Sequence, residues 1–143
     1  MKRIILTAVI GILISDFAFG QKDMTKYKAF IKTADSLYNA KNYKNSAIAY
    51  QNAFDSNEGK AYPRDRYNAA CTFALVGDSE KAFYHLIYSA EHPRIKYKNY
   101  NHITTDSDLN SLHKDEQWEK LVKLVKANKD EAEKDLDKPL VAI

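Results

Sequence analysis

The side chains that could do chemistry in this chain are few, and their spacing points away from catalysis. His85 and His92 are seven residues apart, which returns two side chains to nearly the same face of a helix, so a metal pair is geometrically conceivable. Zinc sites, however, use three or four protein ligands, and positive charge is favoured near a helix C-terminus. We therefore expect both histidines to lie on the helix surface without a metal.

The carboxylates Asp106 and Asp108 stand two residues apart, where a short helical turn is expected. Asp106 or Ser107 can cap that turn, which explains the spacing more simply than acid–base catalysis does. The chain also has no Gly-rich phosphate loop, Gly-x-Ser-x-Gly elbow, Cys-x-x-Cys pair or His-Glu-x-x-His motif. We expect a protein that is not an enzyme and that uses no metal and no cofactor.

Cys71 is the only cysteine, so the chain can form no internal disulfide and its stability must come from packing. Small residues surround it in the sequence, which indicates a helix–helix contact, and free cysteines are usually buried. We expect a buried thiol, with a link between two chains as the alternative.

Apolar residues recur at intervals of three and four from Met24 to about Ala90, which predicts helices rather than strands. The few glycines and prolines divide this segment into four helices connected in pairs by two or three residues. Links this short force antiparallel neighbours, so the helices form hairpins. The predicted helices are Lys22 to Ala40, Tyr43 to Ser56, Pro63 to Val76 and Ser79 to His92.

The two hairpins are related to each other at an offset of 36 residues. Small residues match small ones, and large apolar residues match large ones. The matched positions are Ala34 with Ala70, Leu37 with Phe73, Lys41-Asn42 with Gly77-Asp78, Ser46 with Ala82, Tyr50 with Leu86 and Ala53 with Ser89. Small side chains let two helices approach to about 8 Å, while the large ones fill the space on either side.

This pattern resembles the tetratricopeptide repeat family, whose unit is a helix-turn-helix of about 34 residues. The closer match is the second hairpin, in Tyr67-Asn68-Ala69-Ala70-Cys71, Leu75-Val76-Gly77-Asp78 and Lys81-Ala82-Phe83. The chain departs from the family because no tryptophan opens either repeat and because the offset is two residues longer. The resemblance implies an all-α fold, a short right-handed α-solenoid of antiparallel hairpins.

The C-terminal part is predicted to cap this array. Residues 95–105 form a connector in which a degenerate helix could begin, and the final helix starts near Lys114 or Asp115 and covers one face through Ala127. Its apolar stripe is Trp118, Leu121, Val122 and Val125. An acidic-leucine turn before such a helix is similar to the end of many bacterial chains of this repeat type, and it would cover the last repeat. Residues 129–143 are charged, and we expect a frayed tail.

The family resemblance places candidate binding residues on the concave face, which the first helix of each hairpin lines. They are Lys28, Lys32, Asp35, Tyr38, Asn39, Tyr67 and Asn68. Tyrosine and asparagine suit peptide recognition. The alternative for Tyr38 and Tyr67 is that they pack between adjacent repeats. The family's Lys-x-x-x-Asn clamp for a peptide carboxylate is missing from these helices, so that activity is not expected.

The N-terminus predicts export. Lys2-Arg3 precede an apolar run from Ile4 to Ile14, which at about eleven residues is shorter than the roughly 20 that a membrane helix needs. Small residues at Ala18 and Gly20 suit a signal peptidase. We expect a cleaved signal peptide at residues 1–20, a helical domain at 21–128 and a periplasmic or secreted protein.

The predicted function is binding of another polypeptide, whose identity the sequence does not give. The formal net charge is only +3, and the sequence contains no block of residues of like charge, so we expect no nucleic-acid partner. A row of lysines on the last helix (Lys120, Lys123, Lys126 and Lys129) is diluted by acids, so a solvated face is favoured over a membrane-binding one. The alternatives are a self-associating structural module and a non-catalytic subunit of an envelope enzyme. The sequence does not decide the oligomeric state.

Overall fold

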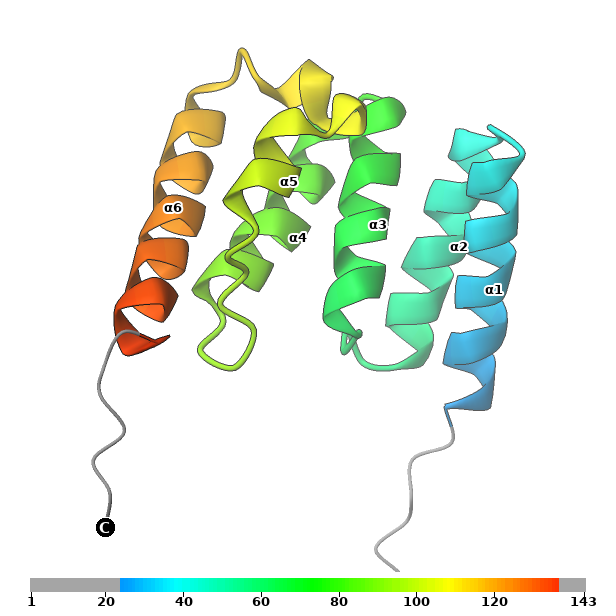
Figure 1. Cartoon of the computed structure of the whole chain (residues 1–143). Coiled ribbons are helices and arrows are strands. Elements are labelled where there is room, and N and C mark those ends of the chain that lie inside the picture. The colour runs from blue at the N-terminus through cyan, green and yellow to red at the C-terminus, as the bar shows by residue number, and fades with distance from the viewer. Residues whose placement is uncertain (1–23, 137–143) are drawn as a thin grey trace, which may run out of the picture.

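The computed structural model describes residues 24–136, and every regular element in this range is a helix. Helices α1 (Thr25–Asn39) and α2 (Tyr43–Ser56) form a first antiparallel pair, and α3 (Pro63–Leu75) and α4 (Ser79–Glu91) form a second. Figure 1 shows the pairs standing side by side. The predicted all-α class is confirmed for these residues. The predicted signal peptide, residues 1–20, lies outside them.

The turns inside the two pairs have the same backbone geometry. Lys41 and Gly77 both adopt positive φ, at 60° and 81°. The N–H groups of the next residues, Asn42 and Asp78, donate to carbonyl oxygens five residues earlier, at 2.8 and 2.9 Å. The relation between the hairpins therefore extends from side-chain size to the backbone, and each helix pair closes through a left-handed residue, a conformation that glycine adopts without strain.

Small residues bring the paired helices together. Ala34 and Ala70 are both fully buried, and so is Ala53. On α2, the hydroxyl of Ser46 donates to the carbonyl oxygen of Ala34 on α1 at 2.8 Å. A side chain as short as serine can reach the neighbouring main chain only when the helix axes are close. The small-residue positions found in the sequence are thus the contact points of the helix pairs.

Residues beyond the second pair form a third pair rather than a cap of one helix. Its two helices are α5 (Tyr100–Thr105) and α6 (Glu116–Leu136), which contact each other, and the 3-10 helix η1 (Ser107–Leu112) connects them. The second helices of the three pairs begin at Tyr43, Ser79 and Glu116, which are 36 and 37 residues apart. η1 packs on α3 and α6 packs on α4, and one apolar core runs from α1 to α6. The helix that could begin within residues 95–105 is α5.

The last helix is longer than the sequence predicts. Its start agrees with the predicted one, and Leu121 and Val125 of the predicted stripe are buried. It does not fray after Ala127 but continues to Leu136. Asn128 explains part of this extension, because its buried amide donates to the carbonyl oxygens of Ala90 at 2.8 Å and Tyr97 at 3.1 Å. Residues 137–143 of the predicted tail lie outside the described residues.

None of the helices in residues 24–136 combines the length and the apolar character that a membrane crossing requires.

Candidate peptide-binding face

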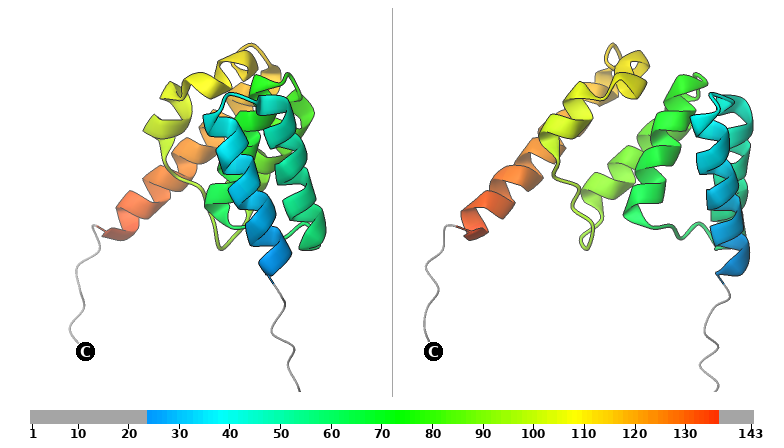
Figure 2. Two further views of the ribbon diagram at one scale, coloured as in Figure 1. Left: turned by 90° about the vertical axis from the view of Figure 1, so that its right-hand side faces the viewer. Right: turned by 45° about the vertical axis from the view of Figure 1, so that its right-hand side comes forward.

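Two adjoining pockets lie on the side of the molecule formed by α1, α3 and α5, the first helices of the three pairs. We call this side the inner face. It is turned toward the viewer in Figure 1, and in the first view of Figure 2 α1 and α5 lie on one side with α2 on the other. The family resemblance predicts a binding surface on the first two of these helices, α1 and α3.

The pocket between α1 and α3 has a volume of about 390 Å³. Its floor contains the buried side chains Tyr27 and Ile31, and its rim carries the exposed Lys28 and Lys32. The two lysines are one helical turn apart on the same face of α1. No acidic group within residues 24–136 forms an ion pair with either one. Their charges are therefore available to a ligand.

The pocket between α3 and α5 has a volume of about 300 Å³ and is aromatic. Tyr67 stacks on Tyr97 with ring centroids 5.3 Å apart, and the ring of His102 lies 4.8 Å from Tyr67. Asn68 and Asn99 supply amides at its edge. A flat ring between two such amides suits an apolar ligand group whose backbone forms hydrogen bonds.

Arg64 lines both pockets and joins them. Its guanidinium donates to one carboxylate oxygen of Asp65 at 2.9 Å, while the hydroxyl of Tyr27 donates to the other at 2.6 Å. Asp65 is buried and Arg64 is largely exposed. The carboxylate therefore accepts from one edge of the guanidinium, and the other edge faces solvent. The inner face thus presents three cations and two acids, Asp65, which is buried, and Asp35, which is partly buried and accepts the hydroxyl of Tyr50 at 2.5 Å.

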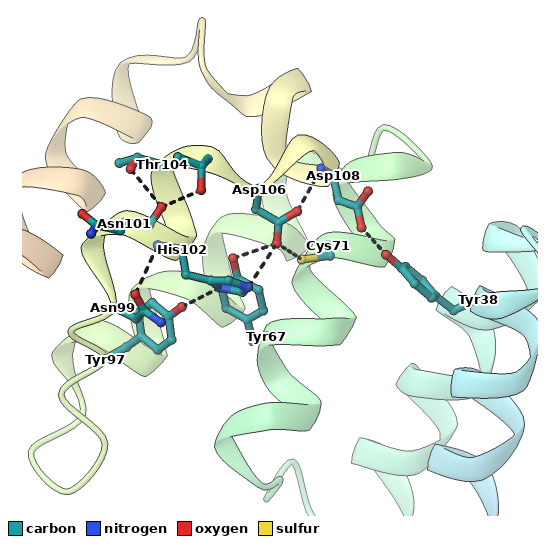
Figure 3. A network of polar contacts seen from close by, with 11 residues as sticks. Tyr38, Tyr67, Cys71, Tyr97, Asn99, Asn101, His102, Thr104, Asp106 and Asp108 are labelled. Carbon is teal, nitrogen blue, oxygen red and sulfur yellow. Dashed lines mark hydrogen bonds and ion pairs between the residues drawn. The ribbon is translucent and has the colours of Figure 1, made fainter.

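Tyr38 and Tyr67 attach η1 to the first helices, as Figure 3 shows. The Tyr38 hydroxyl donates to Asp108, and the Tyr67 hydroxyl donates to Asp106 at 2.9 Å. Burial raises the pKa of both hydroxyls well above the ordinary value, with the neighbouring carboxylates acting in the same direction. The hydroxyls of both tyrosines therefore have partners in the third pair, which agrees with the packing alternative for these hydroxyls. The ring of Tyr67 nevertheless lines the pocket between α3 and α5.

Asp106 also caps η1, since its second oxygen accepts the N–H of Asp108 at 3.1 Å, as the sequence predicts. Cys71 completes a group of three possible metal ligands with these two acids, their atoms lying within 4.8 Å of one another. Burial raises the pKa of the Cys71 thiol far above its usual range, and the negative charges of Asp106 and Asp108 raise it further. A protonated thiol and carboxylates that already accept protein donors are poor ligands. This cluster fits a structural role at the α3 and η1 contact.

Of the seven predicted concave-face residues, five line the two pockets. Lys28, Lys32 and Asp35 border the first pocket, and Tyr67 and Asn68 border the second. Tyr38 lies under η1, and Asn39 is exposed at the end of α1.

Sequence reasoning missed nine pocket residues, among them Tyr62, Arg64, Tyr97, Asn99 and His102. The signal that could have found the last three is the excess of Tyr and Asn between residues 95 and 105. That composition is unusual for a connector that only spans two helices.

The histidines do not form the conceivable metal pair. The prediction that His85 lies on the surface is wrong, because it is buried beside Phe73 and bonded to Arg66 through Nδ1 at 3.2 Å. His92 instead ends α4, where its Nδ1 accepts the N–H of Arg94 at 3.3 Å. Burial, followed by Arg66, lowers the pKa of His85 to about 4, so the ring is neutral near pH 7.

The lysine row on α6 is neutralised within its own helix. Each lysine has an acid four residues away, at distances from 2.7 to 3.9 Å. The pairs are Lys120 with Glu116, Lys123 with Glu119, Lys126 with Asp130 and Lys129 with Glu133. This arrangement agrees with a solvated helix face and offers no unpaired basic strip to an anionic surface.

No family model matches this chain, and comparisons with curated proteins and with solved structures find no match.

Proposed function

We propose that this protein is an exported, non-catalytic adaptor that binds a segment of another polypeptide along its inner face. The three helix pairs are then a short right-handed α-solenoid of the tetratricopeptide type. The near-constant spacing of the second helices and the repeated turn geometry support this description. The Lys2-Arg3 start and the apolar run after it are the basis for proposing export.

The observation that carries the proposal is the pair of adjoining pockets with different chemistry. The first has unpaired lysines on its rim, and the second has stacked tyrosines flanked by amides. Arg64 connects them, so one extended segment can place an acidic side chain at α1 and an apolar one at α5. Extended chain advances about 3.3 Å per residue, so a segment of a few residues covers both.

A random-peptide display selection against the purified protein tests this proposal. We expect recovered peptides to combine an acidic residue with an aromatic or aliphatic one a few positions away. Fluorescence polarisation with a labelled synthetic peptide then measures affinity for the wild type and for the variant Lys28→Gln, Lys32→Gln, Arg64→Gln. We expect this variant to bind at least about tenfold more weakly, which corresponds to a loss of about 1.4 kcal/mol.

The matched control is Lys120→Gln, Lys123→Gln, Lys126→Gln, which removes the same formal charge from α6, a helix that lines neither pocket. We expect its affinity to change less than about twofold, since those lysines are already paired. Equal losses in both variants would show a general charge effect and would contradict the inner-face site. Light scattering on the free protein separates the adaptor from the self-association alternative, because only the latter predicts growth with concentration.

A further inference from the structure

A second site is built on the opposite side of the second helix pair, around a buried arginine. Arg66 on α3 is only 3% exposed. Its Nη2 donates to the carbonyl oxygen of Gly59 at 2.5 Å, and its guanidinium carbon lies 3.9 Å from the ring centre of Tyr88. Its Nη1 lies 3.2 Å from His85 Nδ1. Its Nε–H, by contrast, is buried without any hydrogen-bond acceptor.

The positive charge of Arg66 has no counter-ion among residues 24–136. Its partners are a carbonyl oxygen, a neutral imidazole and aromatic rings, and none of these carries a full negative charge. Burying a cation without an anion is costly, because the charge loses its hydration without gaining an ion pair. An incoming anion would remove that cost and would fill the empty position at Nε.

The helical framework does not require a cation here. At the offset of 36 residues, the positions of Arg66 and His85 correspond to Phe30 and Ala49 in the first pair. That pair forms the same turn and the same small-residue contact without a buried charge. Arg66 and His85 are therefore an addition to the framework of the second pair.

A pocket of about 290 Å³ lies between α2 and α4 and is bordered by both groups. Phe54 and Tyr84 give it an apolar wall, and Tyr84 is largely exposed at its opening. Lys81 borders it as well. We call it the outer pocket.

Around the outer pocket, the positive charge of Arg66 lies deep and the negative charges lie at the surface. Arg66 is buried, whereas the acids Asp55 and Glu80 are exposed and therefore screened by solvent. Gln51 already donates to Asp55 at 2.9 Å, which holds that carboxylate away from the interior. Because Arg66 can only donate, His85 Nδ1 must accept and the ring proton stays on Nε2. The depth of the pocket thus offers donors.

We propose that the outer pocket binds a carboxylate carried on an aromatic or aliphatic group, with Arg66 as its counter-ion. One carboxylate oxygen takes the Nε–H of Arg66. The apolar part lies between Phe54 and Tyr84. Lys81, which is half exposed and paired with Asp78 at 3.4 Å, contributes a weaker positive charge beside it. A free amino acid derivative and the C-terminal residue of a peptide share this chemistry. The site is independent of the inner face, since the two share no lining residue.

Nuclear magnetic resonance of the ¹⁵N-labelled full chain tests the proposal directly. The probes are N-acetyl-phenylalanine and its amide, which differ only in the carboxylate. We expect the acid to shift the Arg66 Nε–Hε signal in a saturable way below about 10 mM, while the amide leaves it unchanged. No shift with the acid, or the same shift with both, would overturn the proposal.

Two variants make the result specific. Lys81→Gln should weaken binding of N-acetyl-phenylalanine only about twofold to threefold while leaving helicity unchanged, because this lysine is half exposed and is already paired with Asp78 at 3.4 Å. The inner-face variant Lys28→Gln, Lys32→Gln, Arg64→Gln should bind this probe as the wild type does. If that variant loses N-acetyl-phenylalanine, the acid binds on the inner face and the outer pocket is excluded. A failure of peptide binding at the inner face would leave the wild-type measurement unaffected.

Discussion

The first and second helix pairs have the same backbone plan but different interiors. Both close through a left-handed residue and both bury an alanine where the helices meet. The first pair places Phe30 and Ala49 where the second places Arg66 and His85. The comparison shows that the framework needs small residues and a tight turn. It also shows that the interior positions of Arg66 and His85 can hold residues of different chemistry. Chemistry that could serve a function is found among the tolerated differences.

The largest effect should come from the shared contact. Ala34→Leu and Ala70→Leu each insert a large side chain where the exposed fraction is zero, so each should lower the free energy of unfolding by about 3 kcal/mol. Urea denaturation measures this, with Ala29→Leu on the exposed face of α1 as the control, expected within about 0.5 kcal/mol of wild type. A mild effect at either buried alanine would break the equivalence of the pairs.

Acid should expose the difference between the interiors. The pKa of His85 is lowered to about 4 from 6.5, first by burial and then by Arg66 and Lys81. Between pH 6.5 and 4, the His85 ring is therefore protonated in the unfolded chain but neutral in the folded protein. The free energy of unfolding that is present above pH 6.5 is lost as the pH falls toward 4. Between pH 7 and 4.5 we expect a loss of roughly 2.5 kcal/mol from this residue.

The matched variant is His85→Ala, which gives the second pair the residue found at Ala49. Denaturation at pH 7 and pH 4.5 should show a smaller acid loss in this variant than in wild type, by about the same roughly 2.5 kcal/mol. Parallel profiles for the two proteins would show that His85 is not the titrating group.

Serine and alanine at the helix contact offer a reciprocal exchange. Ser46→Ala removes the 2.8 Å bond to the Ala34 carbonyl oxygen and should cost about 1 kcal/mol. Ala82→Ser, at the equivalent position, can form the same bond to Ala70 and should cost less than about 0.5 kcal/mol. Thermal unfolding compares the two. If Ala82→Ser costs about 2 kcal/mol, as an unpaired buried hydroxyl would, the second contact is differently spaced.

The smallest effects should come from the turns. Gly77→Ala meets no atom within 4 Å, so only its positive φ opposes the substitution, at about 1 kcal/mol. Lys41→Gly relieves the same conformation in the first pair and should stabilise by about 0.5 kcal/mol after the entropy of glycine is subtracted. Changes of the same sign in both turns would contradict their common geometry.

Local signals in the sequence are sufficient to locate the helices. Pro63 at the first turn of α3, Gly77 at the turn and Asp78 as the cap of α4 each act on their own neighbours, and the predicted helix starts at residues 43, 63 and 79 agree with the structure. The small-residue repeat likewise predicts which alanines are buried. The helix starts and the turn depend on residues within one helical turn, whereas the small-residue positions are found by comparing the two hairpins at an offset of 36 residues.

Tertiary contacts account for what the sequence did not predict. His85 is buried beside Arg66 of another helix, which donates to its Nδ1. Helix α6 continues past Ala127, where the amide of Asn128 donates to a carbonyl oxygen of α4. Arg64 is a site residue because α1 on one side and α5 on the other complete the two pockets that it lines. Each case requires two segments far apart in sequence, which helical periodicity alone does not reveal.

Asn128 ties three segments together through one amide. Because its two hydrogen bonds end on the last turn of α4 and on the loop before α5, α6 cannot separate without uncovering both carbonyl oxygens. Opening of the C-terminal helix is thus coupled to opening of that loop and of the aromatic pocket beside it. Amide protons on α6 and α5 should exchange with solvent together, as one cooperative unit, rather than progressively from the chain end.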